Sequence, residues 1–335
     1  MCTGEEGGES TRRILVTGAA GFIGSHSVGA LLERGYDVVG FDNLKTGSLK
    51  NIAKFSGSKS FKFVKGDLLN HKEIEAALSG ANAIVHLAAN PDVKAGTEDT
   101  KLDYEQNIHA TYNLLEAMKL SGAKKIVFAS TSTVYGDARV LPTPENYGPL
   151  MPISLYGASK LACEALVSGY SHSFGFEGVA IRLANVVGPV GGHGIIRDFL
   201  TKLASNQKTL EVLGDGTQSK SYLHIDDCVS ALVLCLERSL GSFEVFNVGS
   251  EDRITVLEIA EIVLEELELH DVKIVTTKDA LGGRGWVGDV KNMLLDVKKI
   301  RDQGWKPSMG SAEAVRQTVR RLLRDGSPEI KGAPR

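Results

Sequence analysis

The sequence has few cysteines and no long apolar run. Its 335 residues include four cysteines, Cys2, Cys163, Cys228 and Cys235, and no pair has the two-residue spacing of a zinc or redox motif. We therefore expect neither a metal site nor a disulfide framework, and we expect the last three cysteines to lie in helices as small apolar residues. Because no apolar stretch is long enough to span a bilayer, no membrane partner is expected.

The sequence also lacks an excess of basic charge. Its net charge is -3 and its pI is near 6.3, which gives no positive field for binding nucleic acid. Residues 1–10 contain three glutamates and three glycines but no apolar core of a signal peptide. We expect these residues to form a flexible acidic tail, and we expect the protein to be cytoplasmic. The length of 335 residues is enough for one large or two modest domains.

A glycine-rich turn follows directly after an apolar strand at residues 14–17. Three glycines with regular spacing suit a dinucleotide pyrophosphate, because they allow a tight turn, close backbone approach and close packing of the next helix. That helix, from about Phe22 to Arg34, would point its first amides at the anion. The residues predicted to contact the cofactor here are Gly18, Gly21, Phe22, Ile23 and Gly24.

An acidic residue, Asp42, ends the next predicted strand, which begins at Asp37. Its carboxylate is placed to accept hydrogen bonds from an adenosine ribose. NAD is favoured over NADP, because a 2′-phosphate would face this negative charge. Lys45 lies close enough to keep NADP as an alternative.

Apolar strands alternate with helices over the first half of the chain. This alternation predicts an α/β fold with a doubly wound, Rossmann-like parallel sheet. The predicted strands begin near Ile14, Asp37, Phe61, Ala83, Lys125 and Val179. Past Gly188 the pattern breaks into glycine-rich loops and shorter elements, which predicts a smaller mixed α/β substrate domain. We expect interleaved domains, with residues 11–187 plus about 222–248 binding NAD, and about 188–221 plus 249–330 binding the substrate.

A phenol and an ammonium, those of Tyr156 and Lys160, lie four residues apart in a predicted helix from about Leu155 to Ser173. This spacing places them on one helix face. The strand from Lys125 ends in the hydroxyl residues 130–133. Ligands bind at the carboxyl ends of parallel strands, so the hydroxyls and the tyrosine are expected to converge. The alternative for the pair is a solvated helix surface.

Together these motifs resemble the extended short-chain dehydrogenase/reductase enzymes that act on nucleotide sugars, and most closely the UDP-glucose 4-epimerases. The resemblance runs from about Arg12 to about Leu323. Besides the glycine turn, it is carried by Gly66-Asp67-Leu68, His86-Leu87-Ala88-Ala89, Thr131 to Gly136, Tyr156 to Lys160, Arg182 to Asn185, Gly214 to Thr217, Tyr222 to Asp227 and Arg284 to Asp289.

The resemblance implies catalytic roles for Tyr156, Lys160 and Thr131. Tyr156 would act as general base and acid, Lys160 would tune it and contact a ribose, and Thr131 would bond the reacting sugar oxygen. A cation and a positive nicotinamide beside the phenol would favour the phenolate and lower its pKa. The implied reaction is NAD-dependent epimerisation at C4 through a transient 4-keto sugar.

The resemblance also implies binding residues outside the glycine turn. For the cofactor these are Asp42, Asn43, Asp67, Leu68, Leu87, Ala88, Ala89 and Asn107, together with Tyr156 and Lys160. For the nucleotide-sugar substrate they are Thr131, Ser132, Tyr156, Asn185, Lys220, Arg284 and Asp289. Packing at strand ends is the alternative for the first set, and a solvated charge is the alternative for each surface cation. We expect His86 to be a hydrogen-bonded core histidine and not a base.

Two departures bear on the reaction. Ser132 and Thr133 stand where dehydrating relatives carry an Asp-Glu pair, and hydroxyls cannot replace an acid and a base at neutral pH. Epimerisation of UDP-glucose and UDP-galactose is therefore our leading hypothesis. The alternatives are UDP-glucuronate or UDP-N-acetylglucosamine as substrate, a dehydratase, and a non-catalytic NAD-binding scaffold. The helix from about Leu102 to Ser121 and the Tyr156 helix are expected to form a homodimer, with packing on the sheet as the alternative.

Overall fold

The large sheet has seven strands, and all of them run parallel. The computed structural model describes residues 12–190, 194–277 and 282–326, so the predicted tail at 1–10 lies outside the described residues. The strands are β1 (Arg13–Thr17), β2 (Asp37–Asp42), β3 (Phe61–Lys65), β4 (Ala83–His86), β5 (Lys125–Thr131), β6 (Glu177–Leu183) and β11 (Phe243–Val248). Their order is β11-β6-β5-β4-β1-β2-β3. The predicted doubly wound parallel α/β fold is confirmed.

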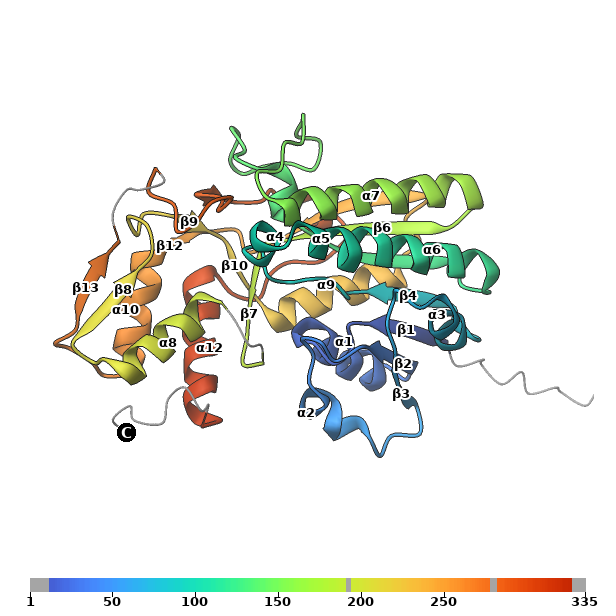
Figure 1. The fold of residues 1–335 in the computed structure, drawn as a ribbon, viewed down its shortest axis with the longest axis horizontal. Helices are drawn as coiled ribbons and strands as arrows, with labels where there is room; N and C mark the ends of the chain where they lie inside the picture. Colours follow the sequence, from blue (N-terminus) through green and yellow to red (C-terminus); the bar gives the residue numbers. More distant parts are fainter. Residues whose placement is uncertain (1–11, 191–193, 278–281, 327–335) are drawn as a thin grey trace, which may run out of the picture.

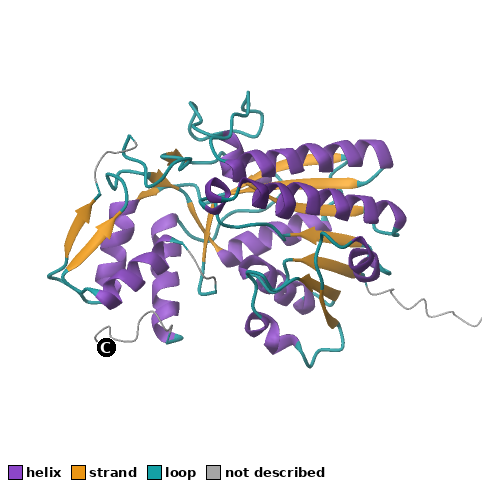
Figure 2. Ribbon diagram, in the orientation of Figure 1, coloured by secondary structure: helices purple, strands orange, loops and turns teal. Residues whose placement is uncertain are grey.

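Helices cover both faces of this sheet (Figure 2). Neighbouring residues of β1 point to opposite faces: Val16 packs with α1 (Phe22–Glu33) and α9 (Ile225–Glu237), and Leu15 packs with the other layer. That layer consists of α3 (His71–Leu78), α6 (Ala110–Leu120) and α7 (Leu155–Phe174). Strands that are buried on both faces explain the continuous apolar runs in the sequence.

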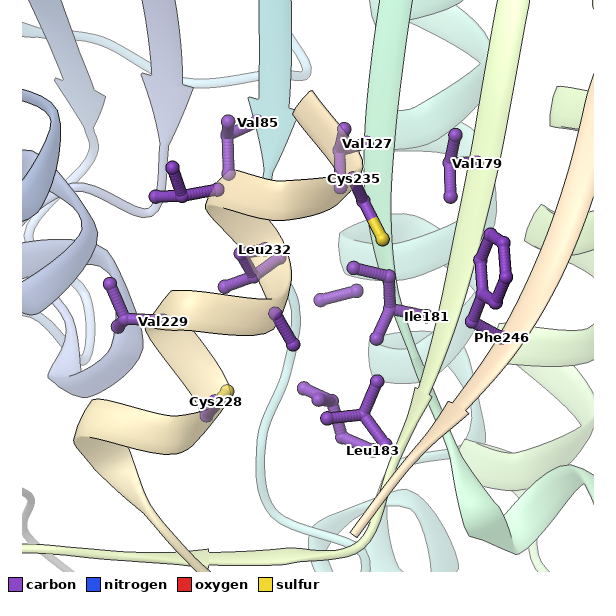
Figure 3. Packing of buried hydrophobic residues seen from close by; sticks show 14 of the residues in the cluster. Val85, Val127, Val179, Ile181, Leu183, Cys228, Val229, Leu232, Cys235 and Phe246 are labelled. Atoms are coloured by element: carbon purple, nitrogen blue, oxygen red, sulfur yellow. The ribbon is translucent and has the colours of Figure 1, made fainter. Parts of the chain in front are cut away.

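The α9 layer shows how the cysteines are used. Cys228 and Cys235 lie on the face of α9 that meets Val127, Ile181 and Leu183 of the sheet (Figure 3). Cys163 of α7 is buried against the opposite face of the sheet. All three are free thiols in helices, as predicted.

The helix predicted from Leu102 to Ser121 is present but contains a π-helical turn. The structure has α4 (Ala95–Glu98), α5 (Thr100–Asp103), a π-helical turn η2 (Tyr104–His109) and then α6. Apolar spacing could not reveal this turn, because α6 keeps the periodic stripe by which the helix was recognised. The π-turn contains Asn107, which contacts α7 through a side-chain hydrogen bond. Such turns are frequent at functional sites.

The smaller half of the molecule is built from short strands and packed helices (Figure 1). Its sheets pair β10 with β7, β9 with both β12 and β14, and β13 with β8, in mixed directions. A core between α8, α10, α12 and β8 includes Phe199, Leu210, Ile259 and Val319. The elements are β7 (Asn185–Val187), α8 (Ile195–Ser205), β8 (Thr209–Val212), β9 (Ser219–Lys220), β10 (Tyr222–His224), β12 (Ile254–Thr255), α10 (Val256–Glu266), β13 (Lys273–Thr276), β14 (Asn292–Met293) and α12 (Ser311–Arg324). The short helix α11 (Lys298–Arg301) packs instead against β11 of the large sheet.

Three short elements complete the fold. They are α2 (Leu49–Ile52) and η1 (Ala53–Phe55) after β2, and a 3-10 turn η3 (Ser132–Tyr135) after β5. Between β10 and β12 the chain returns to the large sheet through α9 and β11. The precise division into domains stays a prediction. No helix in the described ranges has the length and apolar character needed to cross a membrane.

Candidate active site

The glycine turn connects β1 to α1 and is closely packed. Gly18 has a φ of +69°, and a Cβ on it would lie 2.8 Å from the backbone nitrogen of Ala88. A Cβ on Gly24 would lie 1.9 Å from the carbonyl oxygen of Gly18. Phe22 and Ile23 begin α1, whose first-turn amides have no partner within the helix. The turn therefore leaves no room for side chains and presents amides to an anion.

The predicted ribose and adenine contacts lie beyond the ends of β2 and β3. The buried carboxylate of Asp42 accepts hydrogen bonds from the backbone amides of Ala20 (2.9 Å) and Leu44 (2.7 Å). Each oxygen keeps a second lone pair for a ribose hydroxyl. Asn43 donates through Nδ2 to Oδ2 of Asp67 at 3.1 Å. Leu68, next to Asp67, is buried. The exposed residue Lys45 follows this group in the chain.

His86, at the end of β4, is fully buried between two threonines. Its Nδ1 lies 2.7 Å from Oγ1 of Thr17, and its Nε2 lies 3.0 Å from Oγ1 of Thr111. Burial lowers the pKa of His86 to about 3, so the ring is neutral. The prediction of a core histidine is confirmed. The amides of Leu87 and Ala88 donate to Thr17 Oγ1, and these two residues and Ala89 are half-buried beside the glycine turn.

Asn107 connects the segment after β4 to α7. Its Oδ1 accepts from the Asn90 amide at 2.8 Å, and its Nδ2 donates to Ser159 Oγ at 2.8 Å and to Asp103 Oδ1 at 3.2 Å. Ser159 in turn donates to the carbonyl oxygen of Tyr156 at 2.8 Å. Asn107 thus positions the tyrosine helix, and its cofactor contact stays a prediction. The buried carboxylate of Asp103 was missed, since nothing in the sequence marks it among many surface acids.

Tyr156 and Thr131 meet where β5 and α7 come together. Ser154 caps α7 by accepting from the Gly157 amide at 3.0 Å, which places Tyr156 in the first turn. Thr131, the last residue of β5, faces the Tyr156 hydroxyl closely enough to lower the pKa of the phenol. Thr131 also caps η3 by accepting from the Thr133 amide at 3.2 Å. The predicted convergence of the tyrosine and the strand-end hydroxyl is therefore present in the structure.

The electrostatics of the pair differ from expectation. Burial, reinforced by the Asp103 carboxylate, raises the pKa of Tyr156 to about 12, and the hydrogen bond from Thr131 opposes this. Lys160 is buried with its ammonium 4.4 Å from the centre of the Phe128 ring, and burial lowers its pKa to about 8. Lys160 does not contribute to the shift in the pKa of Tyr156. The expectation that Lys160 lowers the pKa of Tyr156 was wrong, because burial and the Asp103 carboxylate raise this pKa.

A buried ion pair supports the end of β5. Arg182 of β6 donates to both carboxylate oxygens of Glu164, which lies one turn after Lys160 on α7. Ser130 donates to the same carboxylate, and Arg182 also donates to the Tyr135 hydroxyl at 2.9 Å. Both charged residues are only 4% exposed. The residues on each side of Thr131 and Lys160 are therefore fixed. Sequence reasoning did not identify Glu164, whose role depends on its distant partner.

The predicted nucleotide-binding residues come together in the smaller half. Lys220 of β9 forms an ion pair with Asp289, which is buried, and Gly285 donates its amide to the same carboxylate at 3.2 Å. Asn185 of β7 is paired in register with Tyr222 of β10. Both Asn185 and Lys220 are half-buried. β9, β10 and the loop before Asp289 thus link three of the four residues predicted to bind the nucleotide: Asn185, Lys220 and Asp289.

Arg284 reaches from the smaller half to the loop after η3. Its guanidinium donates to both carboxylate oxygens of Asp137, at 3.1 and 2.8 Å, and to the carbonyl oxygen of Asp289. A Cβ on Gly288 would lie 3.0 Å from the carbonyl oxygen of Ile153, just before α7. The loop therefore lies against the start of the tyrosine helix. Sequence reasoning missed Asp137, because an ion pair across 147 residues leaves no local pattern.

Within the described ranges, no group of three or more His, Cys, Asp or Glu residues is arranged to hold a metal ion.

The fold and the site define a dinucleotide-binding α/β protein with a tyrosine, a lysine and a threonine at the carboxyl edge of its sheet. The family model for the NAD dependent epimerase/dehydratase family matches residues 14–249. The chain belongs to this family of extended short-chain dehydrogenase/reductase enzymes.

Relatives of known name match almost the whole chain. The UDP-glucose 4-epimerase of Mycolicibacterium smegmatis is 33% identical over 325 residues, covering 92% of this chain and 97% of the relative. The UDP-glucuronate 4-epimerase of Thermodesulfobacterium geofontis is 33% identical over 314 residues, covering 91% and 94%. Similar overall identity thus accompanies different sugars.

Solved structures agree with this assignment. A UDP-galactose 4-epimerase superimposes with a TM-score of 0.82 and 42% identity, covering 93% of this chain and 99% of that one. The UDP-glucose 4-epimerase of Thermus thermophilus, solved in complex with NAD, gives a TM-score of 0.82 at 33% identity with the same coverage.

Proposed function

We propose that this protein is an NAD-dependent nucleotide-sugar 4-epimerase that interconverts UDP-glucose and UDP-galactose. The observation that carries the proposal is the convergence of Tyr156 and Thr131 where α7 meets the end of β5, with Lys160 one helical turn further along α7. This set lies at the carboxyl edge of the sheet, where a doubly wound fold binds its ligands.

The glycine turn fits the pyrophosphate of NAD. Side chains are excluded at Gly18 and Gly24 by contacts with Ala88 and within the turn itself, so only backbone faces the ligand. Asp42 would bind the adenosine ribose, and Asn43, Asp67 and Leu68 would lie near the adenine. Leu87, Ala88 and Ala89 would line the cofactor between the glycine turn and α7.

The chain's own residues supply the proton chemistry. Tyr156 is protonated at neutral pH, since burial raises its pKa to about 12. Bound NAD would supply a hydride acceptor and a positive charge beside the phenol. Tyr156 would take the proton of the sugar 4-hydroxyl and later return it, and Thr131 would hold the same oxygen by donating as the alcohol becomes a ketone. Lys160, buried one turn further along α7, would donate to a ribose hydroxyl of the cofactor.

Hydroxyls at the two positions after Thr131 support epimerisation over dehydration. Ser132 is buried in η3, and Thr133 Oγ1 lies 3.1 Å from Thr131 Oγ1. Neither can act as the additional acid or base that loss of water requires. UDP-glucuronate is the second candidate substrate, because a relative with that activity in its name is as similar as the UDP-glucose enzymes.

We also propose a homodimer formed through α6 and α7. These helices lie side by side on one face of the sheet (Figure 1) and carry exposed apolar residues. Tyr112, Leu120 and Phe174 are 45%, 75% and 48% exposed. Burial of such residues is a normal driving force for association. Light scattering after size-exclusion chromatography tests it, and a monomer at micromolar concentration would contradict it.

The function is tested with purified protein and UDP-galactose, without added cofactor. Formation of UDP-glucose with no net change in NADH absorbance is the expected result. A stable 4-keto product would show a dehydratase instead. No turnover of UDP-galactose, UDP-glucuronate or UDP-N-acetylglucosamine by protein that retains NAD would contradict the proposal and support the scaffold alternative.

A further inference from the structure

Trp286 lies in the loop that links Arg284 to Asp289, and its indole N–H has no role in the interactions described so far. The Nε1 atom is buried, and it has no hydrogen-bond partner among the described residues. A buried donor without a partner costs free energy, so native proteins rarely keep one without a reason. A bound ligand that supplies an acceptor is one such reason.

Two lysines from different halves of the molecule meet at this indole. The ammonium of Lys94, between β4 and α4, lies 4.7 Å from the ring centre, and that of Lys220, on β9, lies 5.4 Å from it. Cations over an aromatic face are attracted to the ring. They also make the surroundings of the N–H positive. An acceptor that carries negative charge fits such surroundings better than a neutral one.

The position of the loop places this donor at the substrate side. Trp286 stands two residues before Gly288, which packs against Ile153 and Ser154 at the start of α7. Tyr156 follows Ser154 by two residues. The indole therefore lies in a loop that joins the nucleotide-binding group to the catalytic helix.

A second unpartnered group points to the same loop. The side chain of Gln218 is 3% exposed, and its Oε1 has no partner within the described ranges. Its Nε2 lies 3.7 Å from where a Cβ on Gly285 would be, next to Trp286. A ligand that offers both acceptors and donors would satisfy both groups. A nucleoside diphosphate has phosphate acceptors and ribose and base donors.

We propose that the Trp286 indole N–H donates a hydrogen bond to the diphosphate of the bound nucleotide sugar, between Lys94 and Lys220. Trp286 is then a substrate-binding residue that acts in affinity and not in the chemical step. The proposal names a further residue of the site in the proposed function and rests on that function for the identity of the ligand.

The test compares UDP with uridine as calorimetric probes. Trp286→Phe keeps a ring for both lysines and removes only the N–H. It is expected to weaken UDP binding about tenfold or more, as for a lost hydrogen bond to a charged group, and to leave uridine affinity and NAD content unchanged. Trp305→Phe is the matched control, because the only other tryptophan donates to Asp227 and Ser230 inside the fold. It should bind UDP as the wild type does.

Outcomes against the proposal are distinct. Wild-type UDP affinity in Trp286→Phe, or an equal loss for UDP and uridine, would overturn it. A second measurement leaves Trp286 intact: in Trp305→Phe it is the sole tryptophan, so its fluorescence should change on UDP addition but not on uridine addition. An unchanged emission at saturating UDP would also overturn the proposal.

Failure of the proposed function would look different. UDP binding that depends on Trp286, in a protein that converts no UDP-sugar, would sustain the binding role and refute the epimerase. Conversion of UDP-galactose with an unchanged KM in Trp286→Phe would refute the binding role and sustain the epimerase.

Discussion

Single residues at the catalytic edge combine burial with charge. Tyr156 and Lys160 lie one turn apart, yet burial moves their pKa values in opposite directions, to about 12 and about 8. Both shifts favour the neutral form of each side chain. The site therefore holds a neutral phenol and a lysine that loses its proton more readily than an exposed one.

Removing the phenol should abolish turnover and leave cofactor binding intact. We expect Tyr156→Phe to lower kcat by about 10³-fold, within the usual range for a lost general base. NAD content, measured after heat release, should match the wild type. Tyr170→Phe is the control on the same helix, because that hydroxyl donates to Glu116 of α6. Wild-type turnover in Tyr156→Phe would remove its proposed role.

Burial of the charged Lys160 should lower the free energy of unfolding, although activity depends on this residue. Its pKa falls from 10.5 in the unfolded chain to about 8 in the fold, so the unfolded state binds more protons between these values. The free energy of unfolding should therefore rise as pH increases from 8 to 10.5, and the cost is fully present below pH 8.

In the variant Lys160→Met, the free energy of unfolding should not rise between pH 8 and 10.5. At pH 7 we expect it to be more stable than the wild type by about 1–3 kcal/mol and at least about 100-fold less active. Urea denaturation across the pH range measures the first effect. Lys298→Met is the control, since Lys298 is exposed and pairs with Asp302 one turn away. Equal pH slopes for Lys160→Met and the wild type would contradict the assignment.

At the scale of elements, the glycine turn is the most constrained segment. A Cβ on Gly24 would collide with the backbone of Gly18 and Ala19, so Gly24→Ala must separate α1 from β1. We expect loss of NAD binding and a lower melting temperature. Gly169→Ala is the control: it lies inside α7 with open space around it, and alanine there should stabilise by about 0.5–1 kcal/mol. NAD titration and thermal unfolding measure both variants.

Elements were predicted well where local pattern decides them. Five of the six predicted strand starts coincide within one residue with β1 to β5, and the helix ranges match α1 and α7 closely. The π-turn η2 was missed, because the apolar pattern of α6 continues past it and does not mark a change from α- to π-helical hydrogen bonding. The strand-end residues Thr131 and Asp42 were located for the opposite reason: the end of an apolar run marks the edge of the sheet.

At the scale of the whole molecule, side-chain contacts between distant segments could not be predicted. Asn247, at the end of β11, is fully buried; it donates to the carbonyl oxygens of Thr143 (2.8 Å) and Asp296 (3.1 Å) and accepts from the Tyr135 hydroxyl (2.7 Å). Its partners lie 49 to 112 residues away in the chain. Only the assembled fold brings them together.

Asn247→Ala should therefore destabilise the whole protein. It leaves buried groups in three segments without partners, so we expect a loss of about 2–4 kcal/mol in the free energy of unfolding. Asn146→Ala is the control, because Asn146 is exposed in the neighbouring loop. The midpoint of urea denaturation is the measurement. A change below about 0.5 kcal/mol would show that water replaces these bonds.

The return of the chain to its first sheet has a consequence for synthesis. β11 completes the edge of that sheet, and α9 covers one face of it, yet both follow α8 and β7 to β10 in the chain. A nascent chain that stops near residue 190 would expose β6 as an open edge beside an uncovered apolar surface. On the ribosome the cofactor-binding half therefore cannot close before about Val248 has emerged, and premature termination within this stretch yields an aggregation-prone product.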